Sequence, residues 1–263
     1  MPKQTINIRE YNRYAWNRQV EINNKFTVPV DITTINAARK GVFSVFLTES
    51  KPVPLEWFPP FRGLKILGLA CGGGQQGPIF AALGANVTIF DNSSAQLNQD
   101  RLVAEREGLV IQTIEGDMLD LSIFPDSAFD LIFNPVSTVF CSDASRVWRE
   151  AFRVLSQSGI FLAGFANPLY YMFGTHFDEQ QDLQVKYKIP YSDLNDMESE
   201  ELVTCIEEGI PLEFGHSLTD LIAGQTNAGF LITDFYEDNC PDSTVSHYHP
   251  VYIATRAIKL RKE

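Results

Sequence analysis

The chain has 263 residues, of which 44% are hydrophobic, and this suits one large domain or a domain with an added lid. Its formal net charge is −12, from 33 acidic against 21 basic residues, which disfavours nucleic acid and anionic membrane surfaces as partners. The longest apolar run, 159–166, is too short to span a bilayer, and four scattered cysteines with no C-x-x-C pair favour a reducing cytoplasm.

Residues 1–63 mix aromatic, charged and amide side chains, and we expect them to form an N-terminal extension that packs on the main domain. Within it, 33–40 is expected to be helical. The stretch 51–60 is expected to be extended, because proline disfavours helix at and before its own position. Tyr11, Tyr14 and Trp16 could belong to the core or could close over a bound ligand.

From 64 onward, short apolar runs alternate with helical stretches, and 64–263 is expected to form the main domain. The runs predict strands at 64–70, 86–91, 110–115, 129–134 and 159–166. The clearest helix is 145–155, with Asp143 as its N-cap and a turn at 156–159. Such alternation predicts an α/β fold with a mostly parallel sheet and helices on both faces.

Residues 167–227 break this rhythm with an aromatic cluster at 167–173 and an acidic run at 193–201. The segment is too long for a simple connection, so we expect it to be an inserted lid. Two further strands, 229–236 and 251–258, end the chain.

The first predicted strand runs into Leu-Ala-Cys-Gly-Gly-Gly-Gln-Gln-Gly at 69–77, which contains the pattern G-x-G-x-x-G from Gly72 through Gly74 to Gly77. A strand, a glycine turn and a helix are typical of nucleotide-binding sheets. Asp91 ends the second strand 19 residues after Gly72, where an acid usually accepts ribose hydroxyls. The alternative is that Asp91 only caps the next helix. These features fit a dinucleotide and any other ligand with a ribose and an adenine.

The residues after the third and fourth strands narrow the choice. Glu115-Gly-Asp-Met118 offers an acid for the adenine amino group and an apolar neighbour for the ring, and the fourth strand ends at Asn134-Pro-Val. With these motifs in this order along the chain, residues 64–166 and the closing strand pair resemble the class I S-adenosylmethionine-dependent methyltransferases. They are most similar to the small-molecule branch that includes ubiquinone and menaquinone biosynthesis enzymes.

The resemblance implies a Rossmann-like fold with a seven-stranded sheet whose last strand is antiparallel, with S-adenosylmethionine as the cofactor and no metal. Gln76, which opens the helix after the glycines, and Trp16 are further candidates for contact with the cofactor. The resemblance assigns Gly72 and Gly74 to the methionine part, Asp91 to the ribose, Asn92 to the adenine edge, Asp117 to the adenine amino group, Met118 to the ring face and Asn134 to the ammonium group.

Two positions depart from the family pattern. Gly68 stands where an acid is usual, and Ala70 stands where the first glycine is usual. The missing acid would help to hold the positively charged amino-acid end of the cofactor. Gln75 and Gln76 could compensate, or they could be ordinary residues of the first helical turn.

Candidates for chemistry on the acceptor are fewer. His176 follows the aromatic cluster and could take a proton from a hydroxyl or an amine, although a surface-loop histidine is the alternative. We expect 168–177 to bind the acceptor, at the carboxyl edge of the sheet, or else to form a satellite core. His247, His249 and Cys240 lack a fourth ligand of recognisable spacing, so no zinc site is expected.

Three functions follow from these patterns. The favoured one is methyl transfer from S-adenosylmethionine to a small-molecule acceptor by in-line displacement. A nicotinamide-dependent oxidoreductase shares the glycine pattern, but the chain has no Tyr-x-x-x-Lys pair. The departures at Gly68 and Ala70 leave room for a third function, a binding protein without transferase activity.

Overall fold

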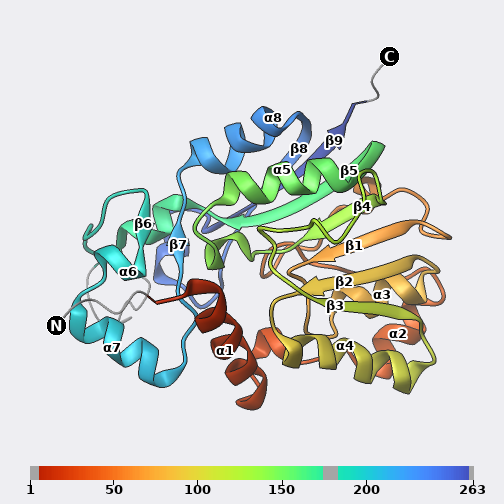
Figure 1. The fold of residues 1–263 in the computed structure, drawn as a ribbon, viewed down its shortest axis with the longest axis horizontal. Helices are drawn as coiled ribbons and strands as arrows, with labels where there is room; N and C mark the ends of the chain where they lie inside the picture. Colours follow the sequence, from red (N-terminus) through yellow and green to blue (C-terminus); the bar gives the residue numbers. More distant parts are fainter. Residues whose placement is uncertain (1–5, 174–182, 261–263) are drawn as a thin grey trace.

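The computed structural model describes residues 6–173 and 183–260 (Figure 1). One sheet runs through the molecule, with helices on both of its faces. Its seven strands lie in the order β3-β2-β1-β4-β5-β9-β8. Their bounds are Lys65–Leu69 (β1), Asn86–Asp91 (β2), Ile111–Glu115 (β3), Phe129–Asn134 (β4), Leu155–Ala166 (β5), Phe230–Asp238 (β8) and Tyr252–Lys259 (β9).

Strand direction confirms the predicted fold. Strands β1 to β5 pair in parallel, whereas β9 is antiparallel to both of its neighbours, β5 and β8. Parallel neighbours place their carboxyl ends along one edge of the sheet. From β1 the chain continues to β2 and β3 on one side and to β4 and β5 on the other, and ligands of α/β sheets bind at the carboxyl edge beside such a switch in strand order. The fold is therefore the Rossmann-like α/β fold with a mostly parallel, seven-stranded sheet.

The two faces of the sheet carry separate cores, as the period of two along a strand requires. Ile66 points toward the face covered by α2 (Ile32–Ala38), α3 (Gln76–Ala82) and α4 (Ser94–Glu107). Leu67, its neighbour, points to the face covered by α5 (Ala144–Val154) and α8 (Gly224–Ala228). The N-terminal extension belongs to the first core, because Ile35, Leu47 and Trp57 are buried in it.

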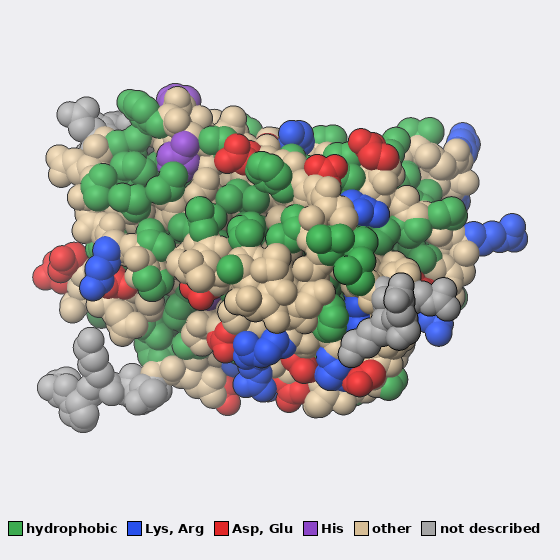
Figure 2. Space-filling view, turned by 90° about the horizontal axis from the view of Figure 1, so that it is seen from above, with side chains coloured by type: hydrophobic (Ala, Val, Ile, Leu, Met, Phe, Trp, Pro, Cys, Tyr) green, Lys and Arg blue, Asp and Glu red, His purple; other side chains and the backbone are tan. Residues whose placement is uncertain are grey.

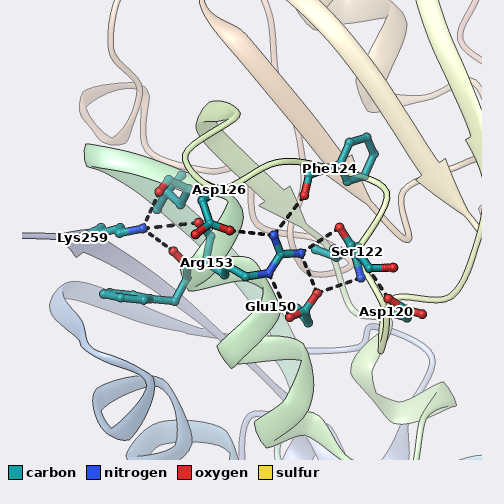
Figure 3. Close-up of polar contacts among 10 residues, drawn as sticks. Asp120, Ser122, Phe124, Asp126, Glu150, Arg153 and Lys259 are labelled. Carbon is teal, nitrogen blue, oxygen red and sulfur yellow. Dashed lines mark hydrogen bonds and ion pairs between the residues drawn. The ribbon is translucent and has the colours of Figure 1, made fainter.

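The carboxyl end of α5 is tied to its surroundings by two cations (Figure 3). Arg153 binds Glu150 and Asp126, and it also donates to the carbonyls of Leu121 and Phe124. Lys259 of β9 is 6% exposed, and its ammonium donates to the carbonyls of Phe152 and Leu155 at 2.6 and 2.7 Å. Cations at this end of a helix satisfy its last carbonyls and complement its dipole.

The helix predicted at 145–155 is present as α5, and Asp143 is its N-cap, with a side chain that accepts from the Arg146 amide. The turn predicted at 156–159 is not a separate element, because β5 begins at Leu155. The register with β4 steps there from Phe129↔Leu155 to Leu131↔Ile160, so the extra residues form a bulge within the strand.

The N-terminal extension holds a helix that the sequence did not predict. Helix α1 (Ile8–Glu21) lies between the sheet with its helices and the segment after β5 (Figure 1). Its buried residues are Asn12, Ala15 and Gln19, and two of these three are amides. The predicted helix at 33–40 is present as α2. Short 3₁₀ turns lie at Lys25–Thr27 (η1) and Leu55–Trp57 (η2).

The insertion after β5 packs beyond α1 and carries a second, two-stranded sheet. That it acts as a lid stays a prediction. Two further 3₁₀ turns lie outside the insertion, at Thr138–Phe140 (η3) and Thr244–His247 (η6). The insertion contains Pro168–Phe173 (η4), Tyr191–Ser192 (β6), Asp193–Asp196 (α6), Ser199–Glu208 (α7), Phe214–Gly215 (β7) and Thr219–Ala223 (η5).

Within 6–173 and 183–260, no helix is both long enough and apolar enough to cross a membrane. On the face drawn in Figure 2, basic side chains are scattered among acidic and hydrophobic ones and form no continuous field.

Candidate active site

A cavity of about 1090 Å³ lies at the carboxyl edge of the sheet. It is lined by the residues that directly follow β1, β2, β3 and β4, by the end of β5, and by parts of the N-terminal extension and the insertion. Its size is at the upper limit of ordinary small-molecule sites, which hold roughly 300–1,000 Å³. The cavity therefore has room for more than one small ligand.

The glycine loop after β1 holds Asp91 against the cavity. The amides of Gly72 and Ser93 donate to the two oxygens of the Asp91 carboxylate, each at 2.9 Å. A Cβ on Gly72 would lie 2.7 Å from the Cβ of Gln96 and 3.1 Å from an Asp91 oxygen, so position 72 has no space for a side chain. Burial raises the pKa of Asp91, and these backbone donors oppose the rise.

The role of N-cap for α4 belongs to Ser93, whose hydroxyl accepts from the Gln96 amide at 3.1 Å. Asp91 supports that turn through the Ser93 amide and also lines the cavity. A carboxylate oxygen can accept two hydrogen bonds, so the Asp91 carboxylate keeps capacity for ligand hydroxyls.

A second set of polar residues, Arg9, Asn92 and Asp117, lies at the ends of β2 and β3. Asn92 donates to the carbonyl of Arg9 at 2.8 Å, and the Arg9 guanidinium lies 3.9 Å from a carboxylate oxygen of Asp117. The other Asp117 oxygen accepts from the Leu119 amide at 2.9 Å. A Cβ on Gly116 would overlap the ring of Phe90, which also lines the cavity. Helix α1 thus joins the ends of β2 and β3.

Most of the predicted cofactor residues come together in this cavity, which is lined by Trp16, Gly72, Gln76, Asp91, Asn92, Asp117 and Met118. Gly74 and Asn134 lie behind the lining of the described chain. Gly74 accepts from the Val30 amide at 3.0 Å, and Asn134 is fully buried, where it donates to the Leu69 carbonyl and the Ser137 hydroxyl. Both shape the loops that surround the ligand.

The two glutamines after the glycines hold the N-terminal extension in place. Gln75 donates to the carbonyls of Lys25 and Val28, and the side-chain oxygen of Gln76 accepts from the Phe46 amide at 3.2 Å. These contacts fold the segments around residues 25–28 and 46 over the glycine loop. The sequence indicated such a role for the aromatic residues of the extension, Trp16 among them, but not for the segments around 25–28 and 46.

The positions that depart from the family pattern are accommodated by the backbone and by β2. Ala70 has φ +47°, in the left-handed region that favours glycine. A Cβ on Gly68 would lie 2.6 Å from Cδ1 of Ile89, so a side chain at position 68 requires the end of the Ile89 side chain to move.

Of the three aromatic residues of α1, only Trp16 lines the cavity. Its ring packs edge-on against Phe140, with centroids 5.0 Å apart. Tyr11 donates from its hydroxyl to the Ile210 carbonyl at 2.8 Å, and Tyr14 is 56% exposed. Asn12 also lines the cavity and joins the carbonyls of Phe140 and Leu212, both at 3.0 Å.

At the far end of the cavity, the sequence indicated Tyr171 but not its partners. The Tyr171 ring is 2% exposed and stacks on Tyr191, whereas its hydroxyl donates to Glu213 at 2.8 Å. Tyr171 therefore serves the satellite core and the cavity at once. Glu213 and Asp193 line the cavity beside it, and their sequence surroundings gave no signal for this role. His176 lies outside the described residues.

Across the described residues, no group of three or more His, Cys, Asp or Glu side chains is arranged to hold a metal ion. His249 has its Nδ1 atom 2.8 Å from the Pro250 carbonyl oxygen. Cys71, in the glycine loop, is buried, and burial raises the pKa of its thiol well above the usual range.

Comparison with known proteins shows one family. Residues 67–163 match the model of the methyltransferase domain family. The chain is 48% identical over 250 residues to the protein named "Uncharacterized methyltransferase YbaJ" of Bacillus subtilis (strain 168), and the match covers 95% of this chain and 98% of that protein.

Solved structures share the fold. An S-adenosylmethionine-dependent methyltransferase from Mesorhizobium loti matches with a TM-score of 0.60 at 19% identity, over 77% of this chain and 94% of that one. Geranyl diphosphate C-methyltransferase from Streptomyces coelicolor A3(2), solved with S-adenosyl-L-homocysteine, matches with a TM-score of 0.60 at 13% identity. That match covers 97% of this chain and 99% of that one. At these identities the likeness concerns the fold alone.

Proposed function

The chain belongs to the S-adenosylmethionine-dependent methyltransferases, and we propose that it transfers the methyl group to a small-molecule acceptor bound in the same cavity as the cofactor. The nicotinamide alternative finds no support among these relatives, and neither does a binding protein without transferase activity. The ubiquinone and menaquinone branch stays a prediction, because the name of the Bacillus subtilis relative specifies no acceptor.

The residues present fit S-adenosylmethionine. Asp91 would accept the ribose hydroxyls, because its carboxylate is fixed at the end of β2 by two backbone donors. Asp117 would accept the adenine amino group, with Asn92 at the ring edge and Met118 against its face. The bare backbone of Gly72 would lie beside the methionine part. The bound cofactor supplies a methyl group that is already electrophilic.

The observation that carries the proposal is the continuity of the cavity. The ends of β1, β2 and β3, where the cofactor residues lie, open into a space lined by Tyr171, Glu213 and Val251. A cofactor with its adenine at β3 and its methionine part at the glycine loop after β1 leaves the part beside the end of β5 open. That part is therefore the place for the acceptor.

The contribution of the protein to such a displacement is chiefly positioning and exclusion of water. The N-terminal extension serves both purposes, since α1 covers the ends of β2 and β3 while Gln75 and Gln76 hold residues 25–28 and 46 over the glycine loop.

Calorimetric titration with S-adenosylhomocysteine tests the cofactor assignment. Asp91→Asn should bind at least tenfold more weakly than the wild type, because a charge-assisted hydrogen bond contributes roughly 1.5–3 kcal/mol. Asp126→Asn is the matched control, because the Asp126 side chain is 77% exposed and remote from the cavity lining, and its affinity should stay within about twofold of the wild type. Equal affinities for the two variants would refute the ribose assignment.

The acceptor class is tested with cell extract and cofactor labelled at the methyl group. Label should appear in the small-molecule fraction and should depend on the added enzyme. Label recovered only in protein or nucleic acid would overturn a small-molecule acceptor, while leaving cofactor binding intact.

A further inference from the structure

The inner wall of the acceptor end carries two neighbouring carboxyls. Strands β6 and β7 pair Tyr191 with Gly215 and Ser192 with Phe214, and Asp193 and Glu213 are the residues next to the last of these pairs. Two hydrogen bonds join these residues: the Asp193 amide donates to the Glu213 carbonyl at 3.1 Å, and the Glu213 amide donates to the side-chain carboxylate of Asp193 at 2.7 Å. Both side chains line the cavity.

The surroundings of this pair disfavour two negative charges. Tyr170, Tyr171 and Tyr252 line the same end of the cavity, together with Ala166 and Val251. Like charges close to each other disfavour ionisation of both groups, and more so where water is scarce. Burial, and next the charge of Asp193, raise the pKa of Glu213 to about 7.

Positive charge is scarce at this end. Among the described residues that line the cavity, the only basic side chains are Arg9 and Lys25. Arg9 lies 3.9 Å from Asp117 at the adenine end, and Lys25 binds Glu49 at 2.6 Å and Asp242 at 3.1 Å. Within the described chain, no lysine or arginine lies within ion-pair distance of Glu213.

Resting on the function proposed above, we propose that the acceptor is an amine with an apolar body, held by the carboxyl pair of Glu213 and Asp193, and that Glu213 takes its proton. A bound ammonium group relieves the repulsion between the carboxyls, and the tyrosine rings favour a cation near their faces. Anionic acceptors are disfavoured by the same charges. A metal ion is a poorer occupant, because no third ligand is arranged for it in the described chain.

The reaction then balances without a further reagent. The ammonium group gives one proton to the Glu213 carboxylate, which makes the nitrogen lone pair available. That lone pair forms the bond to the methyl carbon while the carbon–sulfur bond breaks, and sulfur keeps the bonding electrons. The product leaves as a methylated ammonium ion, and Glu213 releases its proton to water. A base with a pKa near neutrality suits this step.

The test uses the full chain saturated with S-adenosylhomocysteine. A panel of primary amines with alkyl and benzyl bodies of increasing length is titrated at about pH 8, each against its matched alcohol and carboxylate. At least one amine should bind tenfold or more tightly than both of its matched compounds. If no amine in the panel exceeds its alcohol, the proposal is wrong, although methyl transfer to another acceptor could still be shown with labelled cofactor.

Variants assign the preference to the pair. Glu213→Gln should reduce the preference for the amine at least tenfold and leave S-adenosylhomocysteine affinity unchanged, whereas Glu213→Asp should keep part of the preference. Glu208→Gln, an exposed acid of the same insertion, is the control and should behave as the wild type. An undiminished preference in Glu213→Gln would remove Glu213 from the role.

The wild type offers a second readout that needs no variant. Affinity for the best amine should rise from about pH 6 to about pH 8, as the Glu213 carboxyl ionises while the amine stays protonated. Among the described residues, the titratable groups beside Glu213 are Asp193, which adds negative charge, and the hydroxyls of Tyr170, Tyr171 and Tyr252, whose pKa values the Glu213 charge helps to raise. An affinity that is flat or falls over this range would contradict the proposal.

Discussion

Asn12 of α1 is the side chain whose loss should separate the insertion from the sheet. It is 3% exposed and makes three hydrogen bonds to the backbone. Its amide group donates to the carbonyls of Phe140 and Leu212, and its oxygen accepts from the Leu212 amide at 2.8 Å. Phe140 follows β4 and Leu212 precedes β7, so one side chain bridges two segments that are distant in sequence.

Asn12→Ala removes all three bonds and leaves buried backbone groups without partners. Each bond contributes a net 0.5–1.5 kcal/mol, roughly, so the expected loss in the free energy of unfolding is about 3 kcal/mol. For a domain of this size, 1 kcal/mol corresponds to about 2–4 °C in melting temperature. The variant should therefore melt roughly 6–12 °C below the wild type.

Thermal unfolding followed by circular dichroism measures this loss, and Asn36→Ala provides the control. Asn36 also lies in a helix but is exposed, so its replacement should change the melting temperature by no more than about 1 °C. Affinity for S-adenosylhomocysteine should fall in Asn12→Ala alone, because α1 also holds Asn92 through the Arg9 carbonyl. If Asn12→Ala has the same melting temperature as Asn36→Ala, α1 does not couple the insertion to the sheet and the reasoning fails.

Burial raises the pKa of Asp100 to about 8, so its proton stabilises the folded state in full below pH ~4, and that contribution is lost as the pH rises to about 8. Asp100→Asn should flatten the decline of the urea midpoint between about pH 5 and 8, and an unchanged slope would contradict the assignment. Ala70→Gly should raise the free energy of unfolding by up to about 1 kcal/mol, because it relieves a φ of +47°, and a lower urea midpoint would show that the strain is absent. Lys259→Met keeps the side-chain stem but removes the donors to Phe152 and Leu155, and it should lower stability by about 2–3 kcal/mol in the same assay. No change would mean that those carbonyls find other donors.

The sheet could be predicted from the sequence because its signals are local. Each strand from β1 to β5 is a short apolar run between turn residues, and the closing pair β9 and β8 reads in the same way. The end of each strand also fixed where Asp91 and Asp117 would lie, since parallel strands bring their carboxyl ends to one edge. The start of β5 was the exception, because a bulge and a turn have the same residues, Ser-Gln-Ser-Gly.

Helix α1 could not be predicted, because its inward face is polar. Hydrophobic periodicity finds helices that bury aliphatic side chains, whereas Asn12 and Gln19 are buried to satisfy backbone carbonyls of other segments. Those carbonyls belong to residues about 190–200 positions away along the chain, and no local pattern records such a partner. The pair of Asp193 and Glu213 was hidden for the same reason, since only the register of β6 and β7 brings the two together.

The departures at Gly68 and Ala70 are resolved by contacts from outside the glycine loop. From behind, Asp100 of α4 reaches the loop and accepts from the Gly73 amide at 3.1 Å. From the front, Gln75 holds residues 25–28, and the Val30 amide donates to Gly74. A loop fixed on both sides keeps its shape with alanine at position 70, because the surrounding contacts outweigh about 1–2 kcal/mol of backbone strain. Restoring an acid at position 68 would bring its Cβ against Cδ1 of Ile89, so the end of that side chain would have to move to admit it.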